Sequence, residues 1–203
     1  REIGDRNGEG EALESLGELY RESEQYPEAI AYSEAALKVA SEVEAHEHMA
    51  GLQREIGKTY FLEGNLTQAI EYYKLALDLY TKRNDFDEEI GTLRLLGEAY
   101  LQLGQMEQAL AYYHQALDKL RAIGDVDNEA IYLNQLGKVY ENLAQTEQAI
   151  AYYQQAVLLT FEAGEFDLGD DYLQHFASCC SKYNCSDRMI VVLEQIVEWY
   201  PKT

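Results

Sequence analysis

The side chains best suited to metal or redox chemistry in this 203-residue sequence are three cysteines and four histidines. Cys179, Cys180 and Cys185 form a cluster without a CxxC pair or a correctly spaced histidine, so they do not match a zinc site. Their odd number, with no framework of pairs, is typical of a reducing cytoplasm. A redox role for Cys179 or Cys185 stays open.

The histidines and carboxylates show no catalytic pattern. His46 and His48 are two residues apart and would not share a helical face, which argues against a metal site there. His114 and His175 have no nucleophile or carboxylate partner that the sequence can place. No glycine-rich phosphate loop, GxSxG or HExxH motif occurs. The sequence therefore predicts no enzyme, no bound metal and no cofactor.

The charge balance narrows the choice of partner. Lys and Arg number 16 and Asp and Glu 37, for a net charge of −21. Such a chain repels nucleic acid and anionic membrane surfaces, and no apolar run approaches the roughly 18 residues of a membrane span. We therefore expect no nucleic-acid partner, no membrane insertion and, with these cysteines, a cytoplasmic protein. Most carboxylates are expected on a solvated exterior, so the positions of the few cations are more informative.

A frame of small and aromatic residues recurs every 40 residues, and it must position the cysteines, histidines and cations of the chain. Its central copy, in residues 91–124, consists of Leu96-Gly97, Tyr100, Gly104, Ala109, Tyr113 and Ala116-Leu117. Apolar residues three and four apart predict a helix before Gly104 and another after it. Gly104 stands where a positive φ ends a helix, while Gly97 and Ala109 are small enough for two antiparallel helices to approach. Each unit is thus predicted to be a helical hairpin.

The order Leu-Gly-x-x-Tyr, then Gly, Ala, Tyr and Ala, resembles the tetratricopeptide repeat (TPR), whose standard unit has 34 residues. The 40-residue unit is longer, and the helix-ending proline of the family is replaced in four units by Ser41, Thr81, Arg121 and Phe161. Such long units resemble those of kinesin light chains, spindle-orientation adaptors, bacterial peptide-sensing regulators and many cyanobacterial proteins. The resemblance implies an all-α fold, an α-α superhelix or TPR solenoid.

The frame predicts one domain over residues 1–203, built from five helix–turn–helix units. The units lie at about 10–42, 47–83, 87–123, 127–163 and 168–200. Residues 1–9 resemble the linker at 121–125, so they are expected to be the tail of a preceding unit in a longer array or larger protein.

The fifth unit is degenerate. Phe176-Ala177 replaces Leu-Gly, and Met189 replaces an alanine. Cys180 replaces the repeated tyrosine, so it is expected to be a buried, reduced thiol. Pro201 falls where a proline would stop the last helix, and an atypical last unit is expected to cap the array.

In TPR arrays the first helix of each unit lines a concave groove. The resemblance therefore implies seven partner-binding positions in this sequence: Arg54, Lys58, Arg94, Asn134, Lys138, Gln174 and Lys182. Three of them, Arg54, Arg94 and Asn134, share one offset in the repeat and are expected to form a ladder. Arginine can hold a carboxylate or phosphate with two hydrogen bonds, and asparagine can bond a peptide backbone.

The leading hypothesis is a protein-binding adaptor or scaffold that holds an acidic or phosphorylated protein segment in this groove. Alternatively, the groove cations only neutralise Glu55, Glu98 and Glu141. A second functional hypothesis is a regulatory or sensor module of a larger protease, ATPase or transcription regulator. A third is a structural part that associates through Met189–Trp199. Because Glu14 and Glu18 do not match the family's clamp for a C-terminal carboxylate, a chaperone-tail receptor is not expected.

Overall fold

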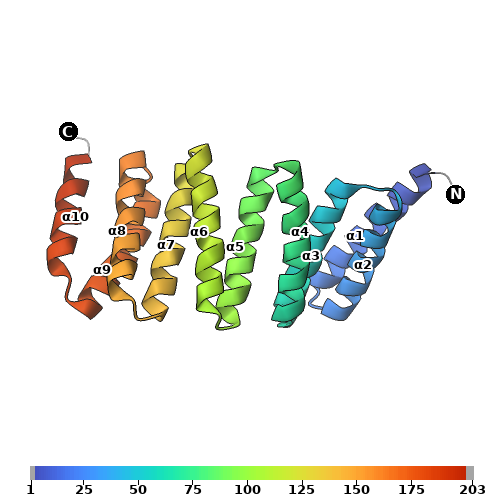
Figure 1. Cartoon of the computed structure of the whole chain (residues 1–203), viewed down its shortest axis with the longest axis horizontal. Coiled ribbons are helices and arrows are strands. Elements are labelled where there is room, and N and C mark those ends of the chain that lie inside the picture. The colour runs from blue at the N-terminus through green and yellow to red at the C-terminus, as the bar shows by residue number, and fades with distance from the viewer. Residues whose placement is uncertain (1–2, 200–203) are drawn as a thin grey trace. The chain divides into compact units, whose positions relative to one another are not determined.

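The computed structural model describes residues 3–199, with side chains from Arg6 onward. Within that range the chain forms ten helices and no strand (Figure 1), which confirms the predicted all-α class. The helices are α1 (Ile3–Glu22), α2 (Tyr26–Glu42), α3 (His46–Glu63), α4 (Leu66–Arg83), α5 (Phe86–Gln102), α6 (Met106–Ile123), α7 (Val126–Asn142), α8 (Thr146–Ala163), α9 (Phe166–Tyr183) and α10 (Ser186–Trp199).

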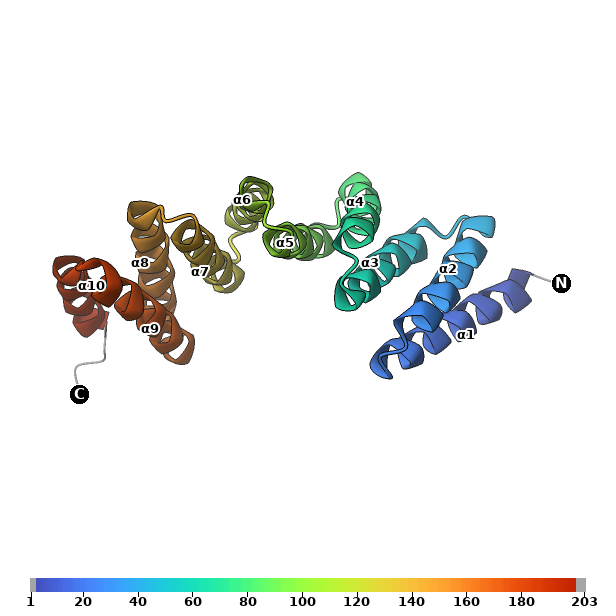
Figure 2. The same ribbon diagram turned by 90° about the horizontal axis from the view of Figure 1, so that it is seen from below.

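The helices divide into two compact units, residues 1–105 with α1 to α5 and residues 106–203 with α6 to α10. In the first unit each helix packs on the next, and Figure 2 shows α1, α3 and α5 in one layer with α2 and α4 in another. In the second unit α6 packs on α7, α7 on α8 and α8 on α9, while α10 contacts both α8 and α9. Odd-numbered helices are the first helices of the predicted units, and even-numbered helices are the second.

Helix α1 begins at Ile3, so residues 3–9, expected as the tail of a preceding unit, run directly into the first helix. Two parts of the sequence interpretation fall outside the described residues. They are the match of Arg1-Glu2 to a linker and the helix stop at Pro201.

The helix ends recur as regularly as the helices. First helices end at left-handed residues spaced 40 apart: Glu24, Gly64, Gly104, Ala144 and Asn184, with φ between 56° and 89°. Gly104 has φ of 76°, as the sequence predicted. The next N–H then reaches back into the helix, as in the bond from Gln105 N–H to the Tyr100 carbonyl at 2.9 Å. This hydrogen bond satisfies one of the carbonyls that a helix end leaves free.

The two helices of a hairpin approach closely at the glycine of the Leu-Gly pair. A Cβ on Gly57 would lie 2.6 Å from the ring of Tyr73, and one on Gly137 would lie 2.6 Å from the ring of Tyr153. Tyr73 has no exposed surface, so its ring fills the space that the absent side chain leaves. The expectation that small residues permit this approach is confirmed at these two positions.

The expectation of a reduced Cys180 is wrong. Cys180 is buried, but it forms a disulfide with Cys185, and Cys179 is the buried free cysteine. The left-handed Asn184 turns the chain back, so that the Cys185 N–H donates to the Cys180 carbonyl at 3.0 Å. These are the two positions that such a helix-ending turn brings together, and their Cα atoms lie 4.5 Å apart.

Candidate functional site

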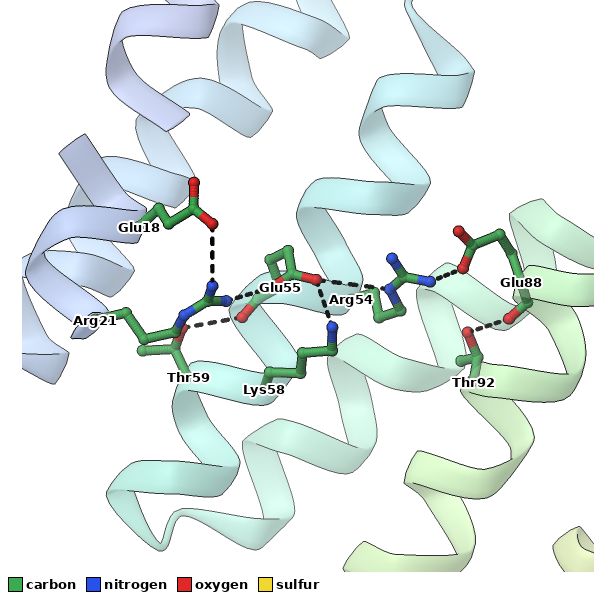
Figure 3. A network of polar contacts seen from close by, with 8 residues as sticks. All are labelled: Glu18, Arg21, Arg54, Glu55, Lys58, Thr59, Glu88 and Thr92. Atoms are coloured by element: carbon green, nitrogen blue, oxygen red, sulfur yellow. Dashed lines mark hydrogen bonds and ion pairs between the residues drawn. The ribbon is translucent and has the colours of Figure 1, made fainter. Parts of the chain in front are cut away.

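A chain of alternating charges crosses the first helices of the first unit (Figure 3). It runs from Glu18 on α1 through Arg21, Glu55 and Arg54 to Glu88 on α5. Helix α3 positions its centre, because residues 54 and 55 follow each other on that helix. We call the surface that carries these side chains, together with Lys58, the first-helix face.

The ion pairs of the first-helix face join successive helices. Arg21 donates to Glu55, which connects α1 to α3, and Arg54 contacts Glu88, which connects α3 to α5. Within α3, Lys58 Nζ lies 2.7 Å from Glu55 Oε1. Arg21 also stands in the last turn of α1, where a cation is favoured by the helix dipole.

Two hollows open on the first-helix face, and Arg54 lines both of them. The first lies between α1 and α3 and includes Arg21 and Glu18 in its lining. The second is bounded by α3, α4 and the start of α5, and the Tyr80 ring centroid is 5.7 Å from Arg54 Cζ. Arg54 Nε is buried and has no hydrogen-bond partner, since Glu55 Oε1 is 3.7 Å away. A buried N–H donor is therefore unsatisfied on a residue that lines both hollows.

Glu55 is the most constrained carboxylate of the face. Burial acts to raise the pKa of Glu55, but hydrogen bonds from Lys58 and Arg21 outweigh burial, and the pKa lies below its usual value of 4.5. A carboxyl group whose pKa is lower in the folded chain stabilises the fold above the unfolded pKa. That stability is lost as pH falls through the folded pKa.

We expect Glu55→Gln to lower the free energy of unfolding by about 1–2 kcal/mol at neutral pH, because two cations lose a charged acceptor. The difference from the unmodified chain should shrink as pH falls below 4.5. Urea denaturation followed by circular dichroism between pH 7 and 3 would measure this dependence. Glu162→Gln, at an exposed residue of α8, is the control. A difference that stays constant with pH would contradict the role of the Glu55 charge.

The other predicted binding residue of the first unit, Arg94, is paired within its own helix. It donates to Glu98 one turn further along α5. The pairs formed by Arg94 and Lys58, with Glu98 and Glu55, agree with the alternative in which groove cations neutralise nearby glutamates. Each of these cations therefore already faces a carboxylate of the chain.

In the second unit, α7 and α9 hold the remaining predicted residues. Asn134 is buried, and its Oδ1 lies 3.1 Å from Nδ1 of His175. Lys138 is half-buried and forms no ion pair among residues 6–199. Burial lowers the pKa of His175, and the Lys138 charge lowers it further. Asn134 is thus already engaged by α9, whereas Lys138 keeps its charge available.

Lys182 and Gln174 lie further along the same surface. Lys182 Nζ is 2.9 Å from Glu141 Oε1, and the Tyr153 hydroxyl donates to the same carboxylate at 3.0 Å. The Lys182 hydrogen bond lowers the pKa of Glu141. Gln174 is exposed. Lys182 thus pairs with Glu141, the third of the glutamates that the groove cations could neutralise. Partner binding by Lys182 and Gln174 stays a prediction.

Sequence reasoning missed Arg21 and Glu88. Both belong to ion pairs that span 34 residues, Arg21 with Glu55 and Arg54 with Glu88. A separation of 34 residues is one 40-residue repeat less about two helical turns, so it joins residues on successive first helices. Opposite charges at this separation were therefore a signal available in the sequence.

Family comparison agrees with the geometry. A family model of the tetratricopeptide repeat matches residues 9–82 and 88–157, which is more than half of the chain. The chain belongs to the tetratricopeptide repeat family. The matched residues end before the last TPR hairpin, α9–α10, which is the degenerate unit of the sequence. No curated protein matches the chain.

Solved structures share the TPR fold at low sequence identity. Kinesin light chain TPR-like repeats from Podosopora anserina are 16% identical, with a TM-score of 0.73 and coverage of 93% of each chain. The STAND protein PH0952 from Pyrococcus horikoshii, which has a TPR sensor, is 20% identical with a TM-score of 0.79, covering 96% of this chain and 30% of that one. A Rap protein complexed with competence and sporulation factor is 17% identical with a TM-score of 0.64, covering 94% and 55%.

The TPR fold is that of a protein-interaction module, and the matched model describes a repeat, not a catalytic domain. Among the described residues, no group of three or more His, Cys, Asp or Glu side chains could hold a metal ion. In the same part of the chain, every helix is too short or too polar to cross a membrane.

Proposed function

We propose that this TPR chain is a non-enzymatic adaptor that binds an acidic or phosphorylated segment of a protein partner on the first-helix face. The observation that carries the proposal is the unsatisfied Nε–H of Arg54, a residue that lines both hollows. A buried donor without a partner costs free energy that an acceptor from a ligand would recover. Arginine is also the side chain best shaped to hold a carboxylate or phosphate with two hydrogen bonds.

Binding of such a segment requires an exchange of partners. Arg21, Arg54 and Lys58 are already neutralised by Glu55 and Glu88. A ligand carboxylate or phosphate that accepts from Arg54 Nε would compete for the same guanidinium charge with Glu88, which contacts Nη1 and whose side chain is 40% exposed and can turn towards water. Displacement from an exposed position costs little, because surface ion pairs contribute about 0–1 kcal/mol. Glu88 thus acts as an internal competitor of the ligand.

The competition gives a test with opposite outcomes for two variants. Using a fluorescein-labelled hexaglutamate peptide as the probe, we expect Arg54→Gln to weaken binding about tenfold, as for loss of a charge-assisted pair. Glu88→Gln should strengthen binding, because Arg54 is released from its competitor while the net charge becomes less negative. Fluorescence anisotropy at several salt concentrations would measure both affinities.

Lys82→Gln and Asp78→Gln are the matched controls. Both residues are exposed on α4, they pair with each other at 2.5 Å, and neither lines the two hollows. Each control changes the net charge by as much as the corresponding test variant. If Lys82→Gln weakens binding of the probe as much as Arg54→Gln does, the binding is general electrostatic attraction and the proposed site is wrong. Absence of probe binding by every form would also contradict the acidic-ligand proposal.

The similarity to sensor proteins favours a second candidate function, a regulatory or sensor module of a larger protein. The supporting observation is that two of the similar structures are longer, a STAND protein with a TPR sensor and a Rap protein in complex with a signalling factor. In such a protein the first-helix face would bind a neighbouring domain or a signal molecule. The complete reading frame would decide this, because a sensor requires an effector domain in the same polypeptide.

A further inference from the structure

The disulfide between Cys180 and Cys185 closes a turn that the other hairpins form without a cross-link. The two cysteines stand at the repeat positions of Tyr100 and Gln105. At each of the five turns the N–H of the later residue donates to the carbonyl of the earlier one, at 2.8–3.0 Å. The backbone geometry of the turn therefore does not require the disulfide.

Stacked tyrosines join the two helices of a hairpin at the position of the disulfide. In three hairpins a tyrosine of the first helix stacks on one of the second, with ring centroids 5.1–5.6 Å apart: Tyr20 on Tyr32, Tyr60 on Tyr72 and Tyr140 on Tyr152. Such pairs stabilise a contact beyond the area that they bury. In the fifth hairpin the same two positions hold Cys180 and Val192, so they form no aromatic pair between α9 and α10.

The small residues that bring the two helices together are replaced in the fifth hairpin as well. A Cβ on Gly57 would lie 3.3 Å from the carbonyl oxygen of Ala69, so α3 and α4 approach closely there. Ala177 and Met189 stand at these two positions in α9 and α10. The disulfide thus occurs in the hairpin that lacks two noncovalent features of the earlier ones. Its loss should weaken this hairpin more than it would weaken a hairpin that keeps both.

Cys185 is the accessible half of the disulfide, because it is half-buried whereas Cys180 is 3% exposed. We propose that this disulfide is a reversible redox site, at which a dithiol reductant attacks Cys185 and thereby loosens the α9–α10 hairpin. Cys179 takes no part in the exchange. It is 1% exposed, and burial raises the pKa of its thiol to about 11, so it stays protonated and unreactive.

The reaction is a thiol–disulfide exchange in two steps. A thiolate of the dithiol bonds to Cys185 Sγ, and Cys180 leaves as a thiolate that takes up a proton. The second thiol of the reductant then attacks the mixed disulfide and releases Cys185 as a thiol. Two electrons and two protons pass from the dithiol to the chain, and the dithiol becomes a disulfide itself.

The cross-linked loop carries Lys182, which connects the redox site to the surface of α7. Lys182 Nζ lies 2.9 Å from Glu141 Oε1, and this hydrogen bond is the main reason why the pKa of Glu141 is lowered. Loosening of the last turn of α9 would release Lys182, and the pKa of Glu141 should then rise towards its usual value. Reduction would therefore change the charges that α7 and α9 present to a partner.

Hydrogen exchange followed by mass spectrometry, on the oxidised chain and on the chain reduced with dithiothreitol, tests the proposal. We expect the amides of α10 and of the last turn of α9 to exchange at least about tenfold faster after reduction, because a cross-link restricts the opened state. Amides of α1 to α7 should keep their rates. Trp199, the only tryptophan of the chain, lies on α10, and reduction should increase its quenching by acrylamide.

Two serine variants separate the disulfide from other causes. Cys185→Ser should exchange like the reduced chain with or without dithiothreitol, which would show that the reductant acts through this bond. Gln145→Ser is the matched control, because Gln145 is exposed at the same repeat position of the α7–α8 hairpin, which keeps its stacked tyrosines. Serine at that position should not accelerate exchange in α8.

Three results would overturn the proposal. The first is an equal exchange rate of α10 in the oxidised and the reduced chain. The second is an equal acceleration from α1 to α10, since the disulfide would then stabilise the whole chain and not one hairpin. The third is a disulfide that dithiothreitol leaves intact in the folded chain. Thiol titration after denaturation measures this, because one thiol is expected before reduction and three after it.

Discussion

Gly169→Glu is expected to lower the free energy of unfolding by about 3–5 kcal/mol, because it combines overpacking with a buried unpaired charge. A Cβ on Gly169 would lie 2.7 Å from the ring of Phe161, which is itself 2% exposed. The same repeat positions one unit earlier hold Arg121 and Glu129, with Arg121 Nε 2.7 Å from Glu129 Oε1. One junction thus uses an ion pair where the next uses an aromatic ring against a glycine.

A double variant that replaces the residues of one junction with those of the other tests this prediction more directly. Phe161→Arg should also destabilise the chain, since it removes a buried ring, at a cost of about 3 kcal/mol or more. The double variant Phe161→Arg with Gly169→Glu should be more stable than the sum of the two losses predicts, by about 1–3 kcal/mol, because it recreates the pair of Arg121 and Glu129. Urea denaturation of all four forms gives this coupling directly. Additive losses would show that the two positions are not exchangeable as a pair.

Gly57→Val is expected to cost about 2–3 kcal/mol, the usual range for inserting methyl groups into a filled core. The new Cβ would overlap two ring carbons of Tyr73, each 2.6 Å away, and this tyrosine is completely buried. The ring cannot move aside without opening the contact between α3 and α4. Thermal and urea unfolding would both show the loss.

Gly51→Ala, on the same helix, is the control for helix propensity. Nothing lies within 4 Å of a Cβ at Gly51. Alanine there should raise the free energy of unfolding by about 0.5–1 kcal/mol, because glycine is the poorer helix former. If both substitutions destabilise α3 equally, the close approach at Gly57 is not the reason for the glycine.

The helices were predictable because each unit repeats the same local rules. Apolar spacing identified the helices, and Gly104 identified a left-handed helix end. Glu24 and Ala144 adopt the same left-handed conformation without being residues that favour it. There the neighbouring helices determine the turn, so only the period of the repeat could have indicated it.

The candidate site was predictable only in part. The repeat frame placed Arg54 and Lys58 on one surface, but the partners of each cation depend on which side chains of the adjacent helices reach it. Arg21 and Glu88 come from those helices and were missed. The disulfide was missed for a related reason. The repeat period places Asn184 at the position of Gly104, but the period alone does not show that the left-handed turn there brings Cys185 onto Cys180.

If the proposed ligand displaces Glu88, the ion pairs of the first-helix face would couple ligand binding to mechanical strain. Glu88 reaches Arg54 from α5, and Glu55 reaches Arg21 from α3, so each pair joins neighbouring hairpins. A ligand that displaces Glu88 from Arg54 breaks one of these ion pairs and leaves the two hairpins easier to separate. Because linkage is reciprocal, a pulling force that stretches the first unit would release the same arginine and raise its affinity for the ligand. The face would then respond to tension as well as to the chemistry of its partner.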